Sequence, residues 1–199
     1  MKKGIDYASS REKRNFDVAV SSLLVPGKRC AEFVIGYFME RGEYSDLSPI
    51  LRQRRMGWNN RIFEIEKFQT LDTDTHQPIN KVAKEMRRLG LDELAQVENI
   101  KAGDMSFTGP RPLIVSEYEA IRDGLPERLG QRWESVVMTM KPGLYSSYGI
   151  YSHVREMADP NEPEIRAEMD IKDAVDVSVV NDIALTHRFI SAALTRRLK

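Results

Sequence analysis

Two adjacent carboxylates, Asp92 and Glu93, are the residues of this sequence best placed to do chemistry. They lie within residues 89–113, a segment that ends in Gly109-Pro110-Arg111-Pro112, a turn carrying a permanent cation. Adjacent acids repel each other, and nearby cations or a metal ion relieve that repulsion. Further cations of this region are Lys84, Arg87, Arg88 and Lys101. Carboxylates, cations and a loop fixed by glycine and proline are the parts needed to handle a phosphate ester with a divalent metal.

The acid pair also has a plainer interpretation. Carboxylates in the first turn of a helix usually face solvent and complement the partial positive charge of the helix N-terminus. The whole segment, however, closely resembles the core signature of the bacterial sugar transferases, the monotopic polyprenyl-phosphate phosphoglycosyl transferases. The matching positions, in order, are Leu91-Asp92-Glu93-Leu94, Gln96, Asn99-Ile100, Gly103-Asp104-Met105-Ser106 and Gly109-Pro110-Arg111-Pro112.

The resemblance implies a reaction. A sugar-1-phosphate would move from a nucleotide diphosphate sugar to polyprenyl (undecaprenyl) phosphate, as the first membrane step of exopolysaccharide or glycoconjugate assembly, ahead of downstream glycosyltransferases. Asp92 would be the nucleophile and form a covalent phospho-sugar intermediate, while Glu93 would hold a Mg²⁺ cofactor. Because a carboxylate is a weak nucleophile toward an anionic phosphate ester, the metal and nearby arginines would have to cancel charge.

The same resemblance extends the candidate phosphate site beyond the acids. Arg111 would bind phosphate with its planar guanidinium fork, beside Pro110. Further expected substrate-binding residues are Arg88, just before the acids, and Gln53, Arg55 and Lys67 of a predicted β-hairpin. The sequence departs from the family pattern at Gln69, where arginine is usual, and at Tyr145, a bulky residue after Lys141-Pro142-Gly143.

Composition narrows the class of protein. A chain of 199 residues with 41% apolar and 30% charged residues is globular, and forms one domain or one domain with appendages. Acidic and basic residues are equal in number, 30 each, so no overall field favours nucleic acid as a partner. The single cysteine, Cys30, excludes an internal disulfide, and the three histidines are scattered. The polar N-terminus predicts no cleavable signal peptide.

The elements that must position these residues belong to the α/β class, in its α+β form. We expect a mostly helical protein with a short β-hairpin, made of residues 50–55 and 62–68 around a turn at 57–60. A doubly wound sheet is not expected, because no glycine-rich dinucleotide fingerprint follows a strand. Apolar periodicity predicts helices over residues 81–89, 125–140 and 175–194.

The N-terminal part of the chain is predicted to have two sections. Residues 1–13 are polar and expected to be flexible, and residues 14–40 are predicted to form a helix, a break at Pro26 and a second helix. Neither half reaches the roughly 20 residues that span a bilayer. The resemblance implies a re-entrant membrane helix that begins near Lys13 and returns to the same face. Charges at Lys28, Arg29 and Glu32 predict a shallow insertion.

Residues 41–199 would then form the catalytic domain, at the surface of the bacterial inner (cytoplasmic) membrane and on its cytoplasmic face. A soluble or only peripherally attached form is one alternative. A second alternative is a diverged, non-catalytic relative that binds nucleotide sugars or a partner glycosylation enzyme, which Gln69 and Tyr145 favour. The intact acid pair and Gly-Pro-Arg-Pro turn favour catalysis. The sequence specifies neither the sugar nor the nucleotide.

Overall fold

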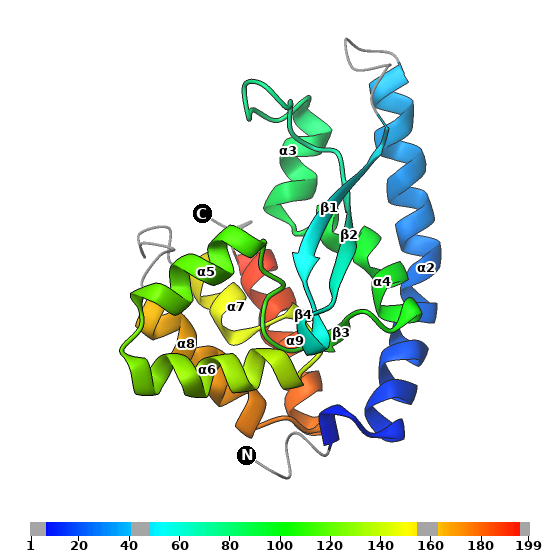
Figure 1. Ribbon diagram of the computed structural model, residues 1–199. Coiled ribbons are helices and arrows are strands. Elements are labelled where there is room, and N and C mark those ends of the chain that lie inside the picture. The colour runs from blue at the N-terminus through cyan, green and yellow to red at the C-terminus, as the bar shows by residue number, and fades with distance from the viewer. Residues whose placement is uncertain (1–6, 41–47, 155–162, 196–199) are drawn as a thin grey trace.

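The computed structural model describes residues 7–40, 48–154 and 163–195. Helices dominate these residues, and two small two-stranded sheets lie between a long N-terminal helix and a C-terminal group of helices (Figure 1). The predicted α+β class, mostly helical with a β-hairpin, is confirmed. Residues 1–6 of the predicted flexible segment 1–13 lie outside the described residues, and its last three residues already belong to a helix.

Helix α2 (Arg11–Glu40) runs along one side of the molecule (Figure 1). It continues through Pro26, so the predicted break at this residue is wrong. A proline inside a helix removes one backbone hydrogen bond, here to the carbonyl of Ser22. The turns beyond it are held by packing, because Ile35 and Met39 are buried against the hairpin and the helix that follows it. Within the described ranges, no helix combines the length and the apolar content needed to cross a membrane.

The predicted hairpin is present. Strand β1 (Ile50–Met56) pairs antiparallel with β2 (Ile62–Phe68), and the short 3₁₀ turn η1 (Trp58–Asn60) joins them. The register sets Gln53 opposite Ile65, and Leu51 opposite Lys67. Because opposed residues and residues two apart share a face, Gln53, Arg55 and Lys67 all project from the same side of the hairpin.

A chain of short elements follows the hairpin and carries the acid pair. Helix α3 (Lys81–Arg88) begins at Asn80, whose side chain accepts a hydrogen bond of 2.8 Å from the backbone of Ala83. The 3₁₀ helix η2 (Leu91–Gln96) and helix α4 (Val97–Ala102) come next. Gly90 separates α3 from η2 with a φ of 67°, in the left-handed region that glycine adopts easily.

The remaining elements form the helical half of the molecule. Strand β3 (Ser106–Thr108) pairs in parallel with β4 (Gly143–Tyr145). The helices around this pair are α5 (Val115–Gly124), α6 (Glu127–Thr139), α7 (Ser147–Val154), α8 (Pro163–Val175) and α9 (Val179–Thr195). Helices α6 and α9 confirm the two helices predicted for this part of the chain.

Three apolar clusters fill the interior. One lies among the C-terminal helices around Trp133, and one lies under α2 and α3 around Phe68. The third joins the hairpin to β3 and β4 through Ile65, Phe107 and Leu144. The third cluster therefore fixes the hairpin face that carries Arg55 and Lys67 against the strand that leads into the Gly-Pro-Arg-Pro turn.

Candidate active site

The acid pair lies in the first turn of η2, directly after the bend at Gly90. Asp92 is buried, with 7% of its surface exposed, and the side chain of Glu93 is 16% exposed. A solvated pair that merely complements a helix terminus would be largely exposed, so the plainer interpretation of these residues does not fit. The tight 3₁₀ turn keeps both carboxylates beside cations contributed by three other segments.

Each acid has its own cations. Oε1 of Glu93 lies 3.1 Å from Nζ of Lys67 on β2 and 3.3 Å from Nη2 of Arg111. Oδ2 of Asp92 lies 3.6 Å from Nη1 of Arg87 on α3. The structure therefore brings together Lys67, Arg111 and both acids, as expected, and adds Arg87, which we had not predicted as a site residue.

The environments of the two acids push their pKa values in opposite directions. Burial raises the pKa of Asp92 above its usual value, and the adjacent Glu93 raises it further. Burial alone would also raise the pKa of Glu93, but Arg111 and Lys67 outweigh it and hold this pKa below its usual value. Asp92 is thus the more basic carboxylate and Glu93 the more permanently charged one. Two neighbouring carboxylates whose pKa values differ in this way commonly take different roles in one reaction.

A pocket opens beside Glu93. Its wall includes Arg55, Lys67 and Arg111, and the hairpin residue Ile65 and the β4 residue Leu144 form its apolar side. Arg55 lies where it was expected. Gln53 is exposed on the same hairpin face and accepts a hydrogen bond from Arg55, so it supports the pocket from outside.

Two other predicted residues have different positions from those expected. Arg88 pairs with Glu85 of its own helix, with Nε 2.8 Å from Oε2, so its guanidinium group is directed to Glu85 and not to the acid pair. Successive residues of a helix point about 100° apart, so only Arg87 of this neighbouring pair faces Asp92. Pro110 is buried, and its carbonyl accepts a 2.8 Å hydrogen bond from the backbone of Gly143. Pro110 therefore holds the loop that carries Arg111 and is not exposed to a substrate.

The loop is fixed by backbone contacts. Besides the bond from Gly143 to Pro110, Gly109 donates to the carbonyl of Tyr145 at 3.1 Å, and Met56 donates to that of Leu113 at 2.7 Å. Gly143 has no room for a side chain, because an added Cβ would lie 2.1 Å from the nitrogen of Gly109. The turn is thus tied to β4 on one side and to β1 on the other, which orients Arg111 toward Glu93.

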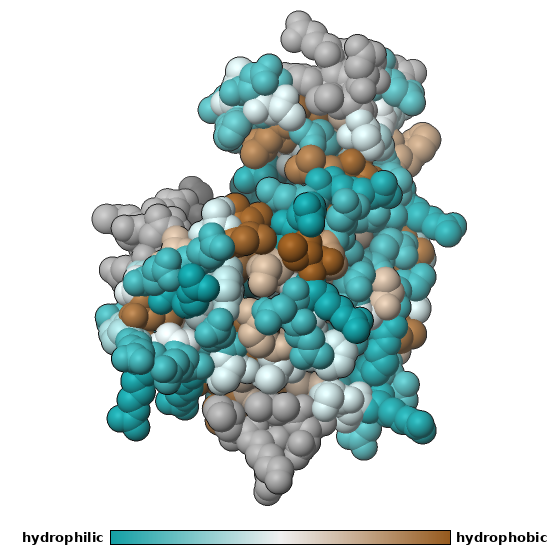
Figure 2. Space-filling view, viewed as in Figure 1, coloured by the Kyte–Doolittle hydropathy of each residue, from teal (hydrophilic) through white to brown (hydrophobic). Residues whose placement is uncertain are grey.

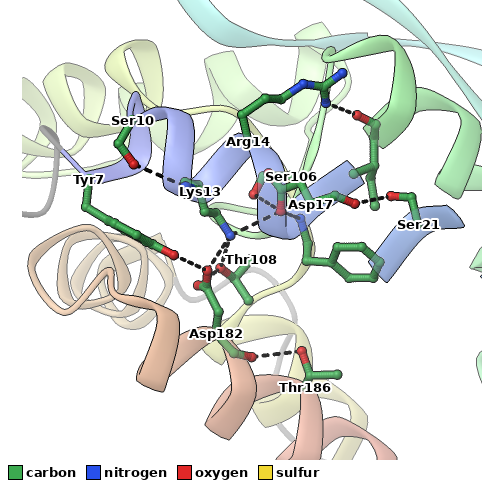
Figure 3. A network of polar contacts seen from close by, with 12 residues as sticks. Tyr7, Ser10, Lys13, Arg14, Asp17, Ser21, Ser106, Thr108, Asp182 and Thr186 are labelled. Atoms are coloured by element: carbon green, nitrogen blue, oxygen red, sulfur yellow. Dashed lines mark hydrogen bonds and ion pairs between the residues drawn. The ribbon is translucent and has the colours of Figure 1, made fainter. Parts of the chain in front are cut away.

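A buried polar network holds β3 from behind (Figure 3). Nζ of Lys13 lies 2.5 Å from Oδ2 of Asp182 and 3.1 Å from Oγ1 of Thr108. Asp17 accepts hydrogen bonds from the Ser106 hydroxyl and the Phe107 backbone, both at 3.1 Å. Lys13, which was expected only near the start of a membrane helix, and Asp17 therefore attach α2 to the strand that precedes the Arg111 loop.

The two departures from the family pattern have distinct places. Gln69 is buried and donates to the carbonyl of Leu71, at the end of β2. The ring of Tyr145 lies against that of Phe107 at a tilt of 43°, with the ring centroids 6.3 Å apart. Burial, and then the charge of Glu93, raise the pKa of Tyr145 to about 12, so its hydroxyl stays protonated near the acids. Tyr145 is thus close enough to Glu93 for the charge of that acid to act on it.

The acids suit a metal that is shared with a substrate. In the described part of the chain, no group of three or more His, Cys, Asp or Glu side chains comes together. Mg²⁺, however, commonly keeps its waters and takes one or two protein carboxylates together with substrate phosphates. Both cation contacts of Glu93 use Oε1, which leaves Oε2 as a carboxylate oxygen for such an ion.

Comparison with known proteins extends over nearly the whole chain. Residues 8–196 match the family model described as "Bacterial sugar transferase". The chain is 29% identical over 169 residues to the galactosyl transferase CpsE of Streptococcus agalactiae, covering 72% of this chain and 34% of that protein. It is 32% identical over 114 residues to the undecaprenyl-phosphate glucose phosphotransferase of Komagataeibacter xylinus, covering 51% of this chain and 21% of that protein.

A third relative is the UDP-glucose:undecaprenyl-phosphate glucose-1-phosphate transferase of Escherichia coli. It is 30% identical over 147 residues, which is 68% of this chain and 30% of that protein. The matched part of this chain thus corresponds to about a third or less of each of these three relatives.

Proposed function

The chain belongs to the bacterial sugar transferase family, and from this premise we propose that it transfers a sugar-1-phosphate from a nucleotide diphosphate sugar to undecaprenyl phosphate. The observation that carries the proposal is the pair Asp92 and Glu93, whose pKa values are shifted in opposite directions beside a pocket lined by Lys67 and Arg111. Two of the relatives carry names that state a transfer to undecaprenyl phosphate.

The proposed reaction has two steps through Asp92. A carboxylate oxygen of Asp92 attacks the phosphorus that bears the sugar; a bond from this oxygen to phosphorus forms, and the bond to the nucleoside monophosphate breaks and releases it. A phosphate oxygen of undecaprenyl phosphate then attacks the same phosphorus. Asp92 leaves as a carboxylate, and the product is an undecaprenyl diphosphate sugar. The raised pKa of Asp92 favours this role, because a more basic carboxylate is a better nucleophile.

The charges around the acids would serve the phosphates. Arg111 and Arg55 would bind phosphate oxygens with planar guanidinium groups, and Lys67 would add a point charge. Glu93 would hold a Mg²⁺ ion, which when bound would neutralise charge on the diphosphate. Arg87 would favour the ionised form of Asp92.

The lipid acceptor implies work at a membrane surface, which we propose is the cytoplasmic face of the bacterial inner membrane. The outer face of α2 supports this placement: Leu23 is 79% exposed and Phe33 is 74% exposed. Figure 2 shows separate apolar side chains among polar ones at the edge of the molecule where this helix lies. Large exposed apolar residues rarely gather on one face of a soluble protein without a partner surface. Attachment would be peripheral or shallow, and products would pass to downstream glycosyltransferases.

Turnover of the purified protein tests the reaction. We expect wild-type protein with Mg²⁺, undecaprenyl phosphate and a panel of UDP-sugars to release UMP, and Asp92→Asn and Glu93→Gln to lose this release by at least about 1,000-fold. Asp123→Asn, a change at an exposed carboxylate on α5, should match the wild type. No UMP release with any sugar would overturn the catalytic proposal. Binding of a UDP-sugar without turnover would favour the non-catalytic relative.

Sedimentation with anionic lipid vesicles tests the membrane proposal. We expect Leu23→Glu and Phe33→Glu each to lower the bound fraction several-fold, because each removes buried apolar area and brings a charge to the lipid. Val180→Glu is the matched control, since Val180 is 77% exposed but belongs to another helix, α9. Equal binding of all three variants and the wild type would contradict the role assigned to α2.

A further inference from the structure

We propose that Arg166, on α8, is a positioning residue of the phosphate pocket. It holds the loop that carries Arg111. The proposal rests on the proposed function for the identity of the ligand, the diphosphate of the donor. Arg166 lies 55 residues beyond Arg111 in the sequence, outside the motifs that identified the site. Its contacts converge on the same loop.

Two guanidinium groups hold the backbone of this loop. Nη2 of Arg166 donates to the carbonyl of Arg111 at 3.4 Å. Nη1 of Arg55, on β1, donates to the next carbonyl, that of Pro112, also at 3.4 Å. The peptide unit between these carbonyls is therefore held from α8 and from the hairpin. Since Arg111 reaches Glu93 from this point, its direction into the pocket depends on both contacts.

These contacts bring three cations, Arg55, Arg111 and Arg166, close together, and the nearby carboxylates neutralise their charge only weakly. Burial lowers the pKa of Arg166, and the neighbouring Arg111 contributes to this lowering. The same holds for Arg55, whose pKa is lowered by burial and then by Arg111 and Arg166. The carboxylates that balance them are Glu93, Asp170 and Glu117, and the side chain of Glu117 is 50% exposed. Like charges held this close attract a polyanion, because its binding relieves their repulsion.

Arg166 itself is poorly satisfied for a buried cation. It is 6% exposed and lies over the ring of Tyr148 at 4.8 Å, and its Nε has no hydrogen-bond partner among the described residues. Its closest acid is Asp170, with Oδ2 at 3.8 Å from Nε, beyond hydrogen-bond distance. Oδ2 of Asp170 instead accepts a 2.9 Å hydrogen bond from Trp133, and Oδ1 has no partner in the described structure.

This pairing does not resemble a stabilising ion pair. A buried pair compensates its desolvation only when the geometry is good and the remaining polar atoms are bonded, and neither condition holds here. Burial also raises the pKa of Asp170 to about 6 despite the nearby Arg166, so the acid gives up part of its charge in mildly acidic solution. Arg166 is thus oriented toward the loop rather than neutralised by its own helix.

Binding of inorganic pyrophosphate to the full chain, measured by calorimetry, tests the role of Arg166 without needing turnover. We expect Arg166→Met to weaken this binding by about 10- to 100-fold, since a hydrogen bond from a charged group is lost at a site that must bind anions. Arg166→Lys keeps a cation beside Tyr148 and Asp170 but lacks the planar fork. It should fold as the wild type does and still lose several-fold in affinity. Arg122→Met, on the exposed side of α5, is the control and should bind as the wild type does.

Turnover adds a readout that a purely structural role would not move. In Arg166→Lys, the KM for the UDP-sugar should rise about 10-fold while the KM for undecaprenyl phosphate stays within about twofold. The proposal is overturned if both Arg166 variants bind pyrophosphate as tightly as the wild type, or if the wild type binds none. If pyrophosphate binding depends on Arg166 but the wild type releases no UMP from any donor, the proposed reaction fails and the role of Arg166 in the anion site stands.

Discussion

Two carboxylates side by side in the sequence differ here because their surroundings differ. Glu93 lies between Lys67 and Arg111, so its charge is secured. Asp92 is buried next to that charge; Lys67 and then Arg87 lower its pKa, but the half-exposed Arg87, at 3.6 Å, is its ion-pair partner among the described residues. The repulsion between the two acids thus acts mainly on Asp92, and it makes Asp92 more basic than Glu93. This division suits a metal-binding acid beside a nucleophile.

Arg87 offers a direct test of this division through the pH dependence of kcat/KM. In the proposed reaction Asp92 must be ionised to attack, so activity should be lost as the pH falls through its raised pKa. Arg87 favours the ionised form, and Arg87→Met should therefore raise this pKa further and move the acidic limb to higher pH. Arg88→Met is the matched control, because Arg88 pairs with Glu85. An equal shift in both variants would show that Arg87 has no specific link to Asp92.

At the scale of residues, the sequence predicted the site residues that lie within the motif. It missed the residues that come close to the motif only in the folded chain. The acids and Arg111 lie in one segment, and strand alternation places Arg55 and Lys67 on one hairpin face. The choice between Arg87 and Arg88 depends on where α3 ends relative to η2, which adjacency in the sequence does not reveal. Arg166 has no local signal, because its contact with Arg111 depends on the packing of α8.

At the scale of elements, the loop that carries Arg111 gains its rigidity from the β3–β4 pair. These strands have three residues each, so their apolar pattern is too short to predict a strand, and no sequence argument anticipated them. The longer helices and the hairpin were predictable because their periodicity extends over several turns or alternations. The continuity of α2 through Pro26 was not, because packing of Ile35 and Met39 offsets the missing hydrogen bond.

Gly143 tests how tightly this strand pair fixes the loop. A Cβ at this position would lie 2.6 Å from the carbonyl carbon of Thr108 as well as against Gly109, and these are backbone atoms that cannot yield alone. We expect Gly143→Ala to lower the free energy of unfolding by about 1–3 kcal/mol and to reduce UMP release more than stability alone accounts for, since Arg111 is displaced. Chemical denaturation and turnover measure both effects.

The control for this substitution is Gly36→Ala on α2. A Cβ there meets nothing within 4 Å, and alanine is the better helix former by about 0.5–1 kcal/mol. It should stabilise the protein slightly and leave turnover unchanged. If Gly143→Ala behaved in the same way, the close approach of β3 and β4 would not be what positions the loop.

At the scale of the whole molecule, the network in Figure 3 joins the two ends of the described chain. Lys13 on α2 contacts Asp182 on α9, 169 residues later, and both also contact Thr108 of β3. All three side chains are buried. The N-terminal helix and the C-terminal helix are therefore attached to the central strand that leads into the Arg111 loop, so the position of the long helix and the geometry of the pocket depend on the same contacts.

A double-mutant cycle on Lys13 and Asp182 measures this attachment. Lys13→Met should lower the free energy of unfolding by about 3–5 kcal/mol, because it leaves Asp17 and Asp182 buried without their shared cation. Asp182→Asn should cost less, because Asp17 still faces Lys13 at 3.3 Å. In the double variant the penalty should fall below the sum of the single ones by more than about 1 kcal/mol, since one uncompensated charge is removed with its partner.

The same cycle on Arg52 and Glu66, a pair across the exposed face of the hairpin at 3.2 Å, provides the comparison. Its coupling should stay below about 0.5 kcal/mol, because solvent screens the pair. Denaturation at two salt concentrations separates the cases further, since added salt weakens an exposed pair and leaves a buried one nearly unchanged. Additive effects at Lys13 and Asp182 would mean that the two helices are held by apolar packing alone, and that the buried ions do not tie α2 to α9.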